Sequence, residues 1–470
     1  MRSIYIMKDK KLFGQFAKYA SLSVLGMIGM SCYILADTFF ISKGLGTSGL
    51  AALNLAIPVY NVMHGAGLML GIGGATKYAV YKSRGEDEKA NAVFTNTAYL
   101  GAAFSAVFML LGGLLSGQLA QLLGADSDTY SLTDIYLKVL LLFSPAFVFN
   151  NILMCFVRND GDPRLAMFAT VSGSLTNIVL DYVFIFPCGL GMFGAVLATG
   201  VAPVIGICFS AWHILRGKNG FRFILAKPSA KHMGADFALG FPSLVEQLSS
   251  AIVIIVFNFI IYGLLGNTGV AAYGVVANIS LVVLSVFTGI AQGTQPLVSR
   301  SHGEGEKKKC FSLFALAAIS AIAFSAVVYI IIAVFALPIA EIFNSEHDPD
   351  LGPIAARGLR LYFIAAPFAG LNIVLCSFFA AMEKPLPSHI LSLLRGFAVI
   401  IPAAFLFSCL WEITGVWLSF PATEAIVAAV GALLFIRIRK KHPPLPSEHS
   451  DAESGQSAVV QNAKKDTTRR

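Results

Sequence analysis

Four polar side chains interrupt otherwise apolar segments of this chain, and together they could bind a cation. Asn177 and Asp181 lie four residues apart in one apolar run, so on a helix they would share a face. Asp37 lies near the end of the first long apolar run, and Thr199 lies in the run that follows Asp181. An aspartate within a membrane-spanning segment is costly to bury, so we expect it to face a protein or water-lined interior and to have a function.

These side chains are expected at one level of a bilayer. Counted from the outer ends of their segments at about 1.5 Å per residue, Asp37, Asp181 and Thr199 lie roughly 6 to 12 Å below the outer surface. Asn177 lies one turn deeper. Four oxygen-bearing side chains at one level suit a hard cation such as Na⁺. Two nearby carboxylates could instead share a proton, because like charges repel strongly in a low dielectric. The sequence leaves both coupling ions open.

The rest of the chain has the composition of a membrane protein. Its 470 residues are 56% hydrophobic and 13% charged, whereas soluble domains average about 25% charged residues. Apolar runs of about 20 residues recur along almost its whole length, and each could cross the hydrocarbon core of a bilayer. We count twelve such runs. The expected fold class is therefore an all-α integral membrane protein with twelve transmembrane helices.

The distribution of charge predicts how the chain lies in the membrane. The net charge of +8 could suggest a nucleic-acid partner, but Lys and Arg fall mainly before the first span, in alternate loops and after the last span. The opposite loops are acidic or nearly uncharged. By the positive-inside rule, both termini are expected in the cytoplasm. The chain is thus expected to be a multi-pass protein of the plasma (inner) membrane, with the lipid bilayer and no nucleic acid as a partner.

The two halves of the chain repeat. Gly49-Leu-Ala-Ala-Leu-Asn54 corresponds to Gly269-Val-Ala-Ala-Tyr-Gly274, and other matches keep the same offset near 220 residues. Six spans is an even number, so the halves are parallel repeats, which place a substrate between them. The predicted domains are an N-terminal lobe, a cytoplasmic connector, a C-terminal lobe and a disordered cytoplasmic tail, at 1–215, 216–235, 236–437 and 438–470.

Motifs of enzymes are missing from the sequence. It has no GxxxxGK[ST] loop, so the chain itself is not expected to be an ATPase. Its seven cysteines are scattered and form no CxxC pair, and no His/Cys/Asp cluster has the spacing of a metal site. We therefore expect no enzymatic activity and no cofactor beyond a coupling ion, H⁺ or Na⁺.

Four motifs in this order make the chain recognisable. "GLGTSGLAALNLAIPV" follows the first span, and "RNDGDPRLAM" and "TNIVLDYVFIF" follow from the fourth span onward, with "GAVLAT" in the sixth. On a duplicated twelve-span chain, this combination resembles the multidrug and toxic compound extrusion (MATE) family over residues 12–437. The resemblance implies a cation-coupled antiporter that exports amphipathic, cationic organic compounds by alternating access. One branch of the family binds its coupling cation through side chains that match Asp37, Asn177, Asp181 and Thr199.

Other polar residues of the spans allow more than one role. Other branches of the family use a C-lobe acidic pair from spans 7 and 10; Glu246 could fill the first position, but span 10 has no carboxylate before its inner end. Asn150 and Asn372 match across the repeat, each five residues after a proline that can kink its helix. We interpret Glu246, Asn150 and Asn372 as candidates for a substrate or proton site, beside structural roles. Arg395 and Glu424 could form a pair inside the C-terminal lobe.

Two rival functions stay open. A lipid-linked precursor flippase of the same superfamily is disfavoured because the spans contain few Lys or Arg residues. A membrane sensor on the same scaffold is disfavoured by the four-residue polar constellation. A duplicated chain encloses its own pathway, so we expect a monomer whose partners are small organic substrates and the coupling cation.

Overall fold

Helices dominate the computed structural model of the protein, which describes residues 10–217, 219–344 and 348–441. No β-strand occurs within these ranges. Residues up to Gly431 form one compact unit, and the residues from Ala432 onward are a second. The tail expected for 438–470 lies outside the described residues from 442 onward.

Two very long helices carry the repeat. α2 (Lys10–Ser83) is broken at Gly46, where φ is +67°, and α8 (Ala230–Gly303) is broken at Gly266, where φ is +61°. Only glycine adopts positive φ without steric cost, so the chain can reverse direction at these points. The breaks are 220 residues apart, the same offset as the sequence repeat.

The remaining helices follow the same pattern in each half. The first half continues through α3 (Asp87–Leu122), α4 (Tyr130–Leu142), α5 (Ser144–Asn159), α6 (Pro163–Ile185) and α7 (Gly191–Leu215). The second half continues through α9 (Lys307–Ile342), α10 (Leu351–Tyr362), η1 (Phe363–Ala365), α11 (Ala366–Ala381), α12 (Pro385–Leu393), η2 (Leu394–Ala398) and α13 (Ile400–Lys441).

The helices account for the predicted number of spans. Eight helical stretches of the described chain are long and apolar enough to cross a membrane, and the bent α4–α5 pair can form a ninth. α2 and α8 each divide at their glycine, and the last stretch divides at Trp411–Glu412, where the backbone leaves helical geometry. Divided at these three breaks, the described chain has twelve spans, which confirms the predicted fold class.

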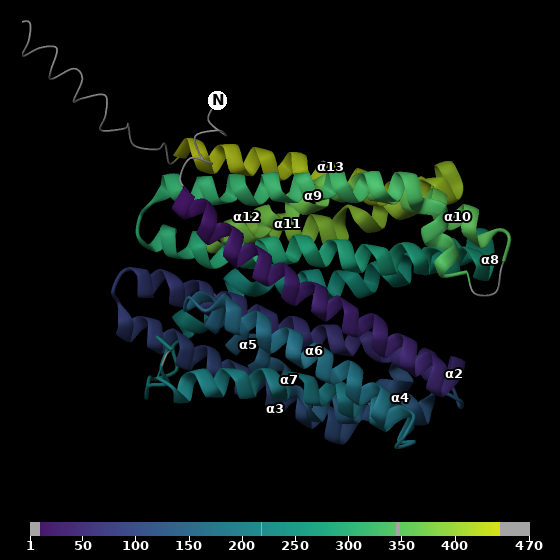
Figure 1. Ribbon diagram of the computed structural model, residues 1–470, viewed down its shortest axis with the longest axis horizontal. Helices are drawn as coiled ribbons and strands as arrows, with labels where there is room; N and C mark the ends of the chain where they lie inside the picture. The colour runs from purple at the N-terminus through teal and green to yellow at the C-terminus, as the bar shows by residue number, and fades with distance from the viewer. Residues whose placement is uncertain (1–9, 218, 345–347, 442–470) are drawn as a thin grey trace, which may run out of the picture. The chain divides into compact units, whose positions relative to one another are not determined.

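The two halves meet along α2 and α8. Figure 1 shows α3–α7 on one side of the compact unit and α9–α12 on the other, with the start of α2 lying diagonally across the second group. The contact is close because small residues line it. A Cβ atom on Gly73 of α2 would lie 2.0 Å from the backbone oxygen of Asp236 in α8, and one on Gly293 of α8 would lie 2.6 Å from that of Tyr19 in α2. The two glycines are 220 residues apart, so the repeat extends to the packing between the lobes.

Candidate functional site

All four residues of the predicted cation site are buried in the N-terminal lobe. Asp37 comes from α2, Asn177 and Asp181 come from one face of α6, and Thr199 comes from α7. Asn177 and Asp181 are fully buried, and Asp37 is 7% exposed. Since α2, α6 and α7 pack against one another, elements far apart in sequence supply a single polar cluster.

Hydrogen bonds join three of these residues. With the Asn177 amide oriented to satisfy both of its groups, Nδ2 donates to Asp181 Oδ2 at 3.1 Å, and Oδ1 accepts from the backbone N–H of Thr199 at 3.2 Å. The Thr199 hydroxyl donates to the Ala195 carbonyl at 3.1 Å. Asn177 therefore presents a donor, rather than an oxygen, to the carboxylate.

The two aspartates lie near each other, and in the described part of the chain no basic side chain pairs with them. Each lies within electrostatic range of the other. Asp37 Oδ1 and Asp181 Oδ1 are buried and have no hydrogen-bond partner. No Lys, Arg or His in the described ranges forms an ion pair with either residue. An uncompensated buried carboxylate is unstable unless it gains a cation or a proton, so this pair is suited to take up one.

Tyrosines surround the pair, and the sequence reasoning missed them. Tyr136 of α4 lies near Thr199 and within electrostatic range of both aspartates. On the Asp37 side, the hydroxyls of Tyr33 and Tyr60 lie 3.0 Å apart in a hydrogen bond. A tyrosine within a membrane span, away from the aromatic belts at the two surfaces, was the signal that could have indicated these residues.

The C-terminal lobe contains a different polar cluster. Glu424 of α13 is fully buried and accepts a hydrogen bond from Arg395 Nε. Asn372 Nδ2 donates to Glu424 Oε2 at 2.7 Å and to its backbone oxygen at 2.9 Å. Arg395 lies within η2, a π-helical turn, and such turns are frequent at functional sites. The pair anticipated between Arg395 and Glu424 is therefore present, and Asn372 belongs to it.

Glu246 lies beside this cluster, within electrostatic range of Arg395 and Glu424. Its side chain is half-buried, whereas Glu424 is fully buried. Arg395 is already bonded to Glu424. The cluster of one arginine and two glutamates therefore has one negative charge left over, and Glu246 is the more accessible carboxylate.

Asn150 is not the counterpart of Asn372 in its contacts. Its buried Oδ1 has no hydrogen-bond partner. That oxygen lies against Gly206 of α7, where an added Cβ would approach it to 2.1 Å. The matched asparagines thus have different surroundings, and the structure does not bring Asn150 or Asn372 into the cluster of Asp37 and Asp181.

An ionic cluster joins the lobes at one end of the helices. Lys77 of α2 pairs with Glu383, which lies between α11 and α12. Arg84 Nη2 and His302 Nε2 approach the other carboxylate oxygen of Glu383 at 3.9 and 3.6 Å. The hydrogen bonds from His302 and then Lys77 lower the pKa of Glu383 to about 2, against the effect of its partial burial.

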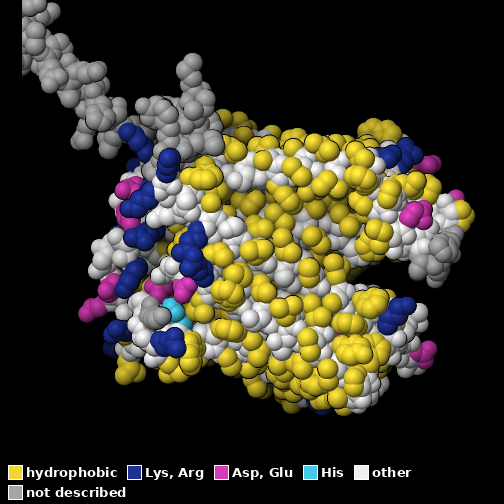
Figure 2. Space-filling view, in the orientation of Figure 1, with side chains coloured by type: hydrophobic (Ala, Val, Ile, Leu, Met, Phe, Trp, Pro, Cys, Tyr) yellow, Lys and Arg dark blue, Asp and Glu magenta, His cyan; other side chains and the backbone are white. Residues whose placement is uncertain are grey.

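The two ends of the helices differ. Figure 2 shows Lys and Arg side chains gathered at the end where α2 connects to α3 and α8 connects to α9, which is also the end of the Glu383 cluster. At the opposite end, Figure 2 shows a notch between the two lobes.

No group of three or more His, Cys, Asp and Glu side chains within the described ranges could hold a metal ion. The cluster of Asp37 and Asp181 contributes only two carboxylates, so any cation bound there would depend on neutral oxygens for its remaining ligands.

Comparisons with known proteins agree with this architecture. The chain is 24% identical over 440 residues to the multidrug export protein MepA of Staphylococcus saprophyticus, covering 93% of this chain and 96% of the relative. A MATE structure in complex with MaL6 superposes with a TM-score of 0.86 at 26% identity, covering 90% of this chain and 95% of the other. An outward-facing multidrug resistance MATE transporter of the MOP superfamily gives a TM-score of 0.85 at 25% identity, with the same coverage.

The family model extends over both lobes. It matches residues 23–183 and 242–406, one segment in each half of the repeat, and the first segment includes three of the four cation-site residues. With its duplicated helices and its buried carboxylates, the chain belongs to the MatE family of membrane transporters.

Proposed function

We propose that the protein is a proton-coupled antiporter that exports amphipathic, cationic organic compounds by alternating access. The observation that carries this proposal is the pair of buried aspartates, Asp37 and Asp181, with no cationic partner in the described residues. Such a pair exchanges an external cation readily, while a carboxylate with its own arginine does not. The relatives named above as multidrug export proteins support the class of substrate.

The orientation of Asn177 supports a proton over Na⁺. With its amide in the orientation that satisfies both of its groups, Asn177 donates to Asp181, and its oxygen accepts from the Thr199 N–H. A sodium ion needs several oxygens directed at it, and this arrangement removes one of the four. Proton transfer needs only the carboxylates, which can share one proton between them.

The charged end of the molecule supports a direction. By the positive-inside rule, the Lys- and Arg-rich end faces the cytoplasm, so both termini and the connector lie there. In this orientation the Glu383 cluster closes the cytoplasmic side and the notch opens outward. Protons then reach Asp37 and Asp181 from outside. By linkage, protonation that favours substrate release requires that substrate binding from the cytoplasm favours proton release.

The C-terminal lobe supplies a contact for the cationic substrate in this proposal. Glu246 is the accessible carboxylate of a cluster with one excess negative charge. A cationic amine in the cavity between the lobes can pair with it, while the apolar body of the compound contacts the apolar helix faces. The monomer contains both lobes and is the proposed functional unit in the plasma membrane.

The test is transport of a fluorescent organic cation by the purified protein in proteoliposomes, with the pH gradient and the Na⁺ gradient imposed separately. We expect movement of the compound to follow the pH gradient and to ignore a Na⁺ gradient at fixed pH. Dependence on Na⁺ alone would overturn the assignment of H⁺ as the coupling ion but would still support antiport activity. No response to either gradient would favour a flippase or a sensor instead.

A further inference from the structure

A second cavity lies outside the region described so far. It has a volume of about 710 Å³ and is lined by α3, α5, the end of α7 and the connector after α7. Every lining residue falls between positions 94 and 223, so the cavity is built by the N-terminal lobe and the connector that follows it. A cavity of this size is large enough for a drug-sized molecule.

The wall formed by the connector is anchored to α3. The N–H of Arg222 donates to Asn91 Oδ1 at 2.9 Å, and the N–H of Ile224 donates to Thr95 Oγ1 at 3.1 Å. Further along, the N–H of Ser229 donates to Asn96 Oδ1 at 2.7 Å. Three polar side chains of α3 thus accept hydrogen bonds from backbone N–H groups of an extended segment that has no strand partner. These bonds hold the segment in place as one wall of the cavity.

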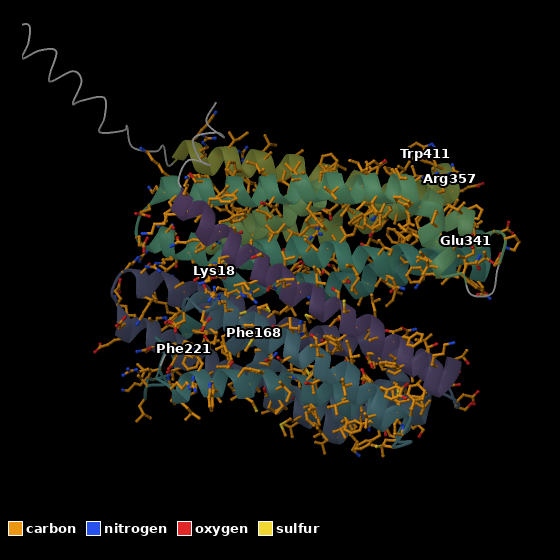
Figure 3. All side chains as sticks on the ribbon, viewed as in Figure 1. Lys18, Phe168, Phe221, Glu341, Arg357 and Trp411 are labelled. Atoms are coloured by element: carbon orange, nitrogen blue, oxygen red, sulfur yellow. The ribbon has the colours of Figure 1, made fainter. Side chains whose placement is uncertain are left out.

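Phe221, labelled in Figure 3, holds the same segment in place by packing against aromatic side chains of the lobe. Phe221 is fully buried, and its ring centroid lies 4.8 Å from that of Phe94 and 6.1 Å from that of Tyr78. The next residues turn outward: Phe223 is 59% exposed, and Leu225 is wholly exposed. Exposed apolar residues on an anchored segment are expected where the segment contacts lipid.

Arg222 is the cation among the described lining residues of the cavity. Arg222 forms no ion pair in the described part of the chain. The nearby carboxylate of Asp160 is already occupied, because it accepts hydrogen bonds from Tyr78 and from the Gly220 N–H. The guanidinium of Arg222 is therefore available to an anion, and arginine binds phosphate oxygens in a bidentate manner.

The depth of the cavity corresponds to the membrane–water interface. On α3 the lining runs from Phe94 to Ala102, which is roughly 10 to 20 Å along the helix from its charged start at Asp87. Trp212 of α7 is 57% exposed and carries the Arg216 guanidinium at 4.2 Å from its ring. Tryptophan and arginine side chains in this arrangement mark the level of the lipid headgroups.

We propose that this cavity binds an anionic phospholipid of the leaflet at the Lys- and Arg-rich end. The phosphate binds Arg222, and an acyl chain lies along the aromatic and alanine face of α3. Charge complementarity and depth support this ligand, since basic pockets at the cytoplasmic ends of transmembrane helices bind anionic headgroups. The site is independent of the proposed transport cycle and would be present in a protein that transports nothing.

The test uses the purified full-length protein in detergent, with phosphatidylglycerol or phosphatidylcholine of identical acyl chains as the added lipid. Bound lipid is counted by native mass spectrometry, and thermal unfolding is followed in parallel. We expect tighter binding of phosphatidylglycerol and a higher Tm in its presence. Arg222→Gln should lower the preference for phosphatidylglycerol about fivefold or more, which is about 1 kcal/mol. Inorganic phosphate alone should leave the Tm unchanged.

Two pairs of variants separate this site from general lipid adhesion. Ala102→Trp fills the cavity from an exposed position on α3 and should remove the bound lipid. Ala103→Trp is its control, because Ala103 is also exposed but lies outside the lining, and this variant should keep the lipid. Arg357→Gln removes an exposed arginine at the other end of the helices and serves as the control for Arg222→Gln. Equal binding of both lipids, or equal losses in the variants and their controls, would overturn the proposal.

Discussion

The two lobes descend from one repeat, yet the cluster at Asp37 and Asp181 and the cluster at Glu424 surround a buried carboxylate in opposite ways. In the N-terminal lobe, Asp37 and Asp181 each have an oxygen without a partner and lack a bonded cation in the described residues. In the C-terminal lobe, Glu424 is equally buried but is bonded to Arg395 and Asn372. In the first cluster no cation of the described residues is bonded to the aspartates, whereas in the second the buried glutamate has a bonded arginine.

Under the proposed function, this difference assigns cation coupling to Asp37 and Asp181 and a structural role to the Arg395–Glu424 pair. A carboxylate whose counter-charge belongs to the protein keeps that partner through a transport cycle, because breaking a buried pair by removing one member costs about 3–5 kcal/mol. A carboxylate without such a partner changes its charge state when a proton arrives. Under the proposed function, the duplication has preserved the helices while the N-terminal cluster responds to the cation gradient and the Arg395–Glu424 pair stabilises the C-terminal lobe.

The largest expected effect comes from Asp181→Asn, which removes the exchangeable charge but keeps the size of the side chain. Coupled export should fall by about 100-fold or more, at the upper end of typical coupling free energies. The Tm in detergent should not fall, because the amide oxygen of the substituted side chain can still accept the hydrogen bond from Asn177 Nδ2. Transport driven by an imposed pH gradient, normalised to protein inserted, measures the effect.

Asp128→Asn is the matched control, because Asp128 is an exposed aspartate in the α3–α4 loop. It should transport like the unmodified protein. Unimpaired export by the Asp181→Asn protein would contradict the assignment of coupling to the N-terminal lobe.

Glu424→Gln should produce a loss of stability. It breaks the hydrogen-bonded pair with Arg395 and leaves Glu246 as the remaining carboxylate of the cluster, so the free energy of unfolding should fall by about 2 kcal/mol. Replacing both residues, in Arg395→Gln/Glu424→Gln, removes the guanidinium that has lost its bonded partner and should recover part of the loss. Thermal unfolding in detergent checks both variants. A double variant less stable than Glu424→Gln would show that the pair contributes more than mutual neutralisation.

Glu383→Gln should give a smaller effect that does not depend on pH in the physiological range. The ordinary pKa of this carboxyl is 4.5 and the folded protein lowers it to about 2. A lowered carboxyl pKa stabilises the folded state above pH 4.5, and this contribution is lost only as the pH falls toward 2. Because the side chain is 20% exposed, the expected cost is about 1–2 kcal/mol.

The measurement is the difference in Tm between Glu383→Gln and the unmodified protein at pH 5, 6.5 and 8, which should be constant. The pH dependence of transport would then originate in the N-terminal lobe and not in the ionic contact between the lobes. A difference that changes between pH 8 and pH 5 would show that the protonation of His302, which lies at that contact, contributes to the pairing.

The sequence predicted the parts of the molecule that follow from periodicity and local chemistry. Apolar runs indicated the spans, and the repeat offset of about 220 residues reappears at Gly46 and Gly266, where the long helices break. The burial of Asp37 and Asp181 also followed, because a carboxylate in an apolar run has to face the interior. The buried positions of both residues agree with that reasoning.

Contacts between distant helices were beyond the reach of the sequence. Nothing local indicates that Tyr136 approaches Thr199, or that Asp236 meets Gly73 across the lobes. The matched Asn150 and Asn372 were expected to behave alike, but only Asn372 has a carboxylate opposite it, since the repeat conserved the backbone and not the neighbouring side chains. Such contacts depend on helix rotation and tilt, which a periodic pattern leaves undetermined.

The smallest expected effect sharpens the comparison most. Thr199→Val removes one neutral oxygen from the N-terminal cluster and leaves both carboxylates in place, so proton-coupled export should change by less than about threefold, under 1 kcal/mol. The lost hydroxyl donates to the Ala195 carbonyl of its own helix and lies beside Tyr136, so only these local contacts are lost and the fold should be retained. Thr199→Ser, which keeps the oxygen, is the control. A sodium site would respond differently, because each oxygen ligand contributes to affinity. A tenfold loss of export in Thr199→Val that is absent in Thr199→Ser would therefore assign sodium binding, rather than proton exchange, to this site. The contrast between aspartates without a bonded basic residue and a glutamate bonded to Arg395 would remain.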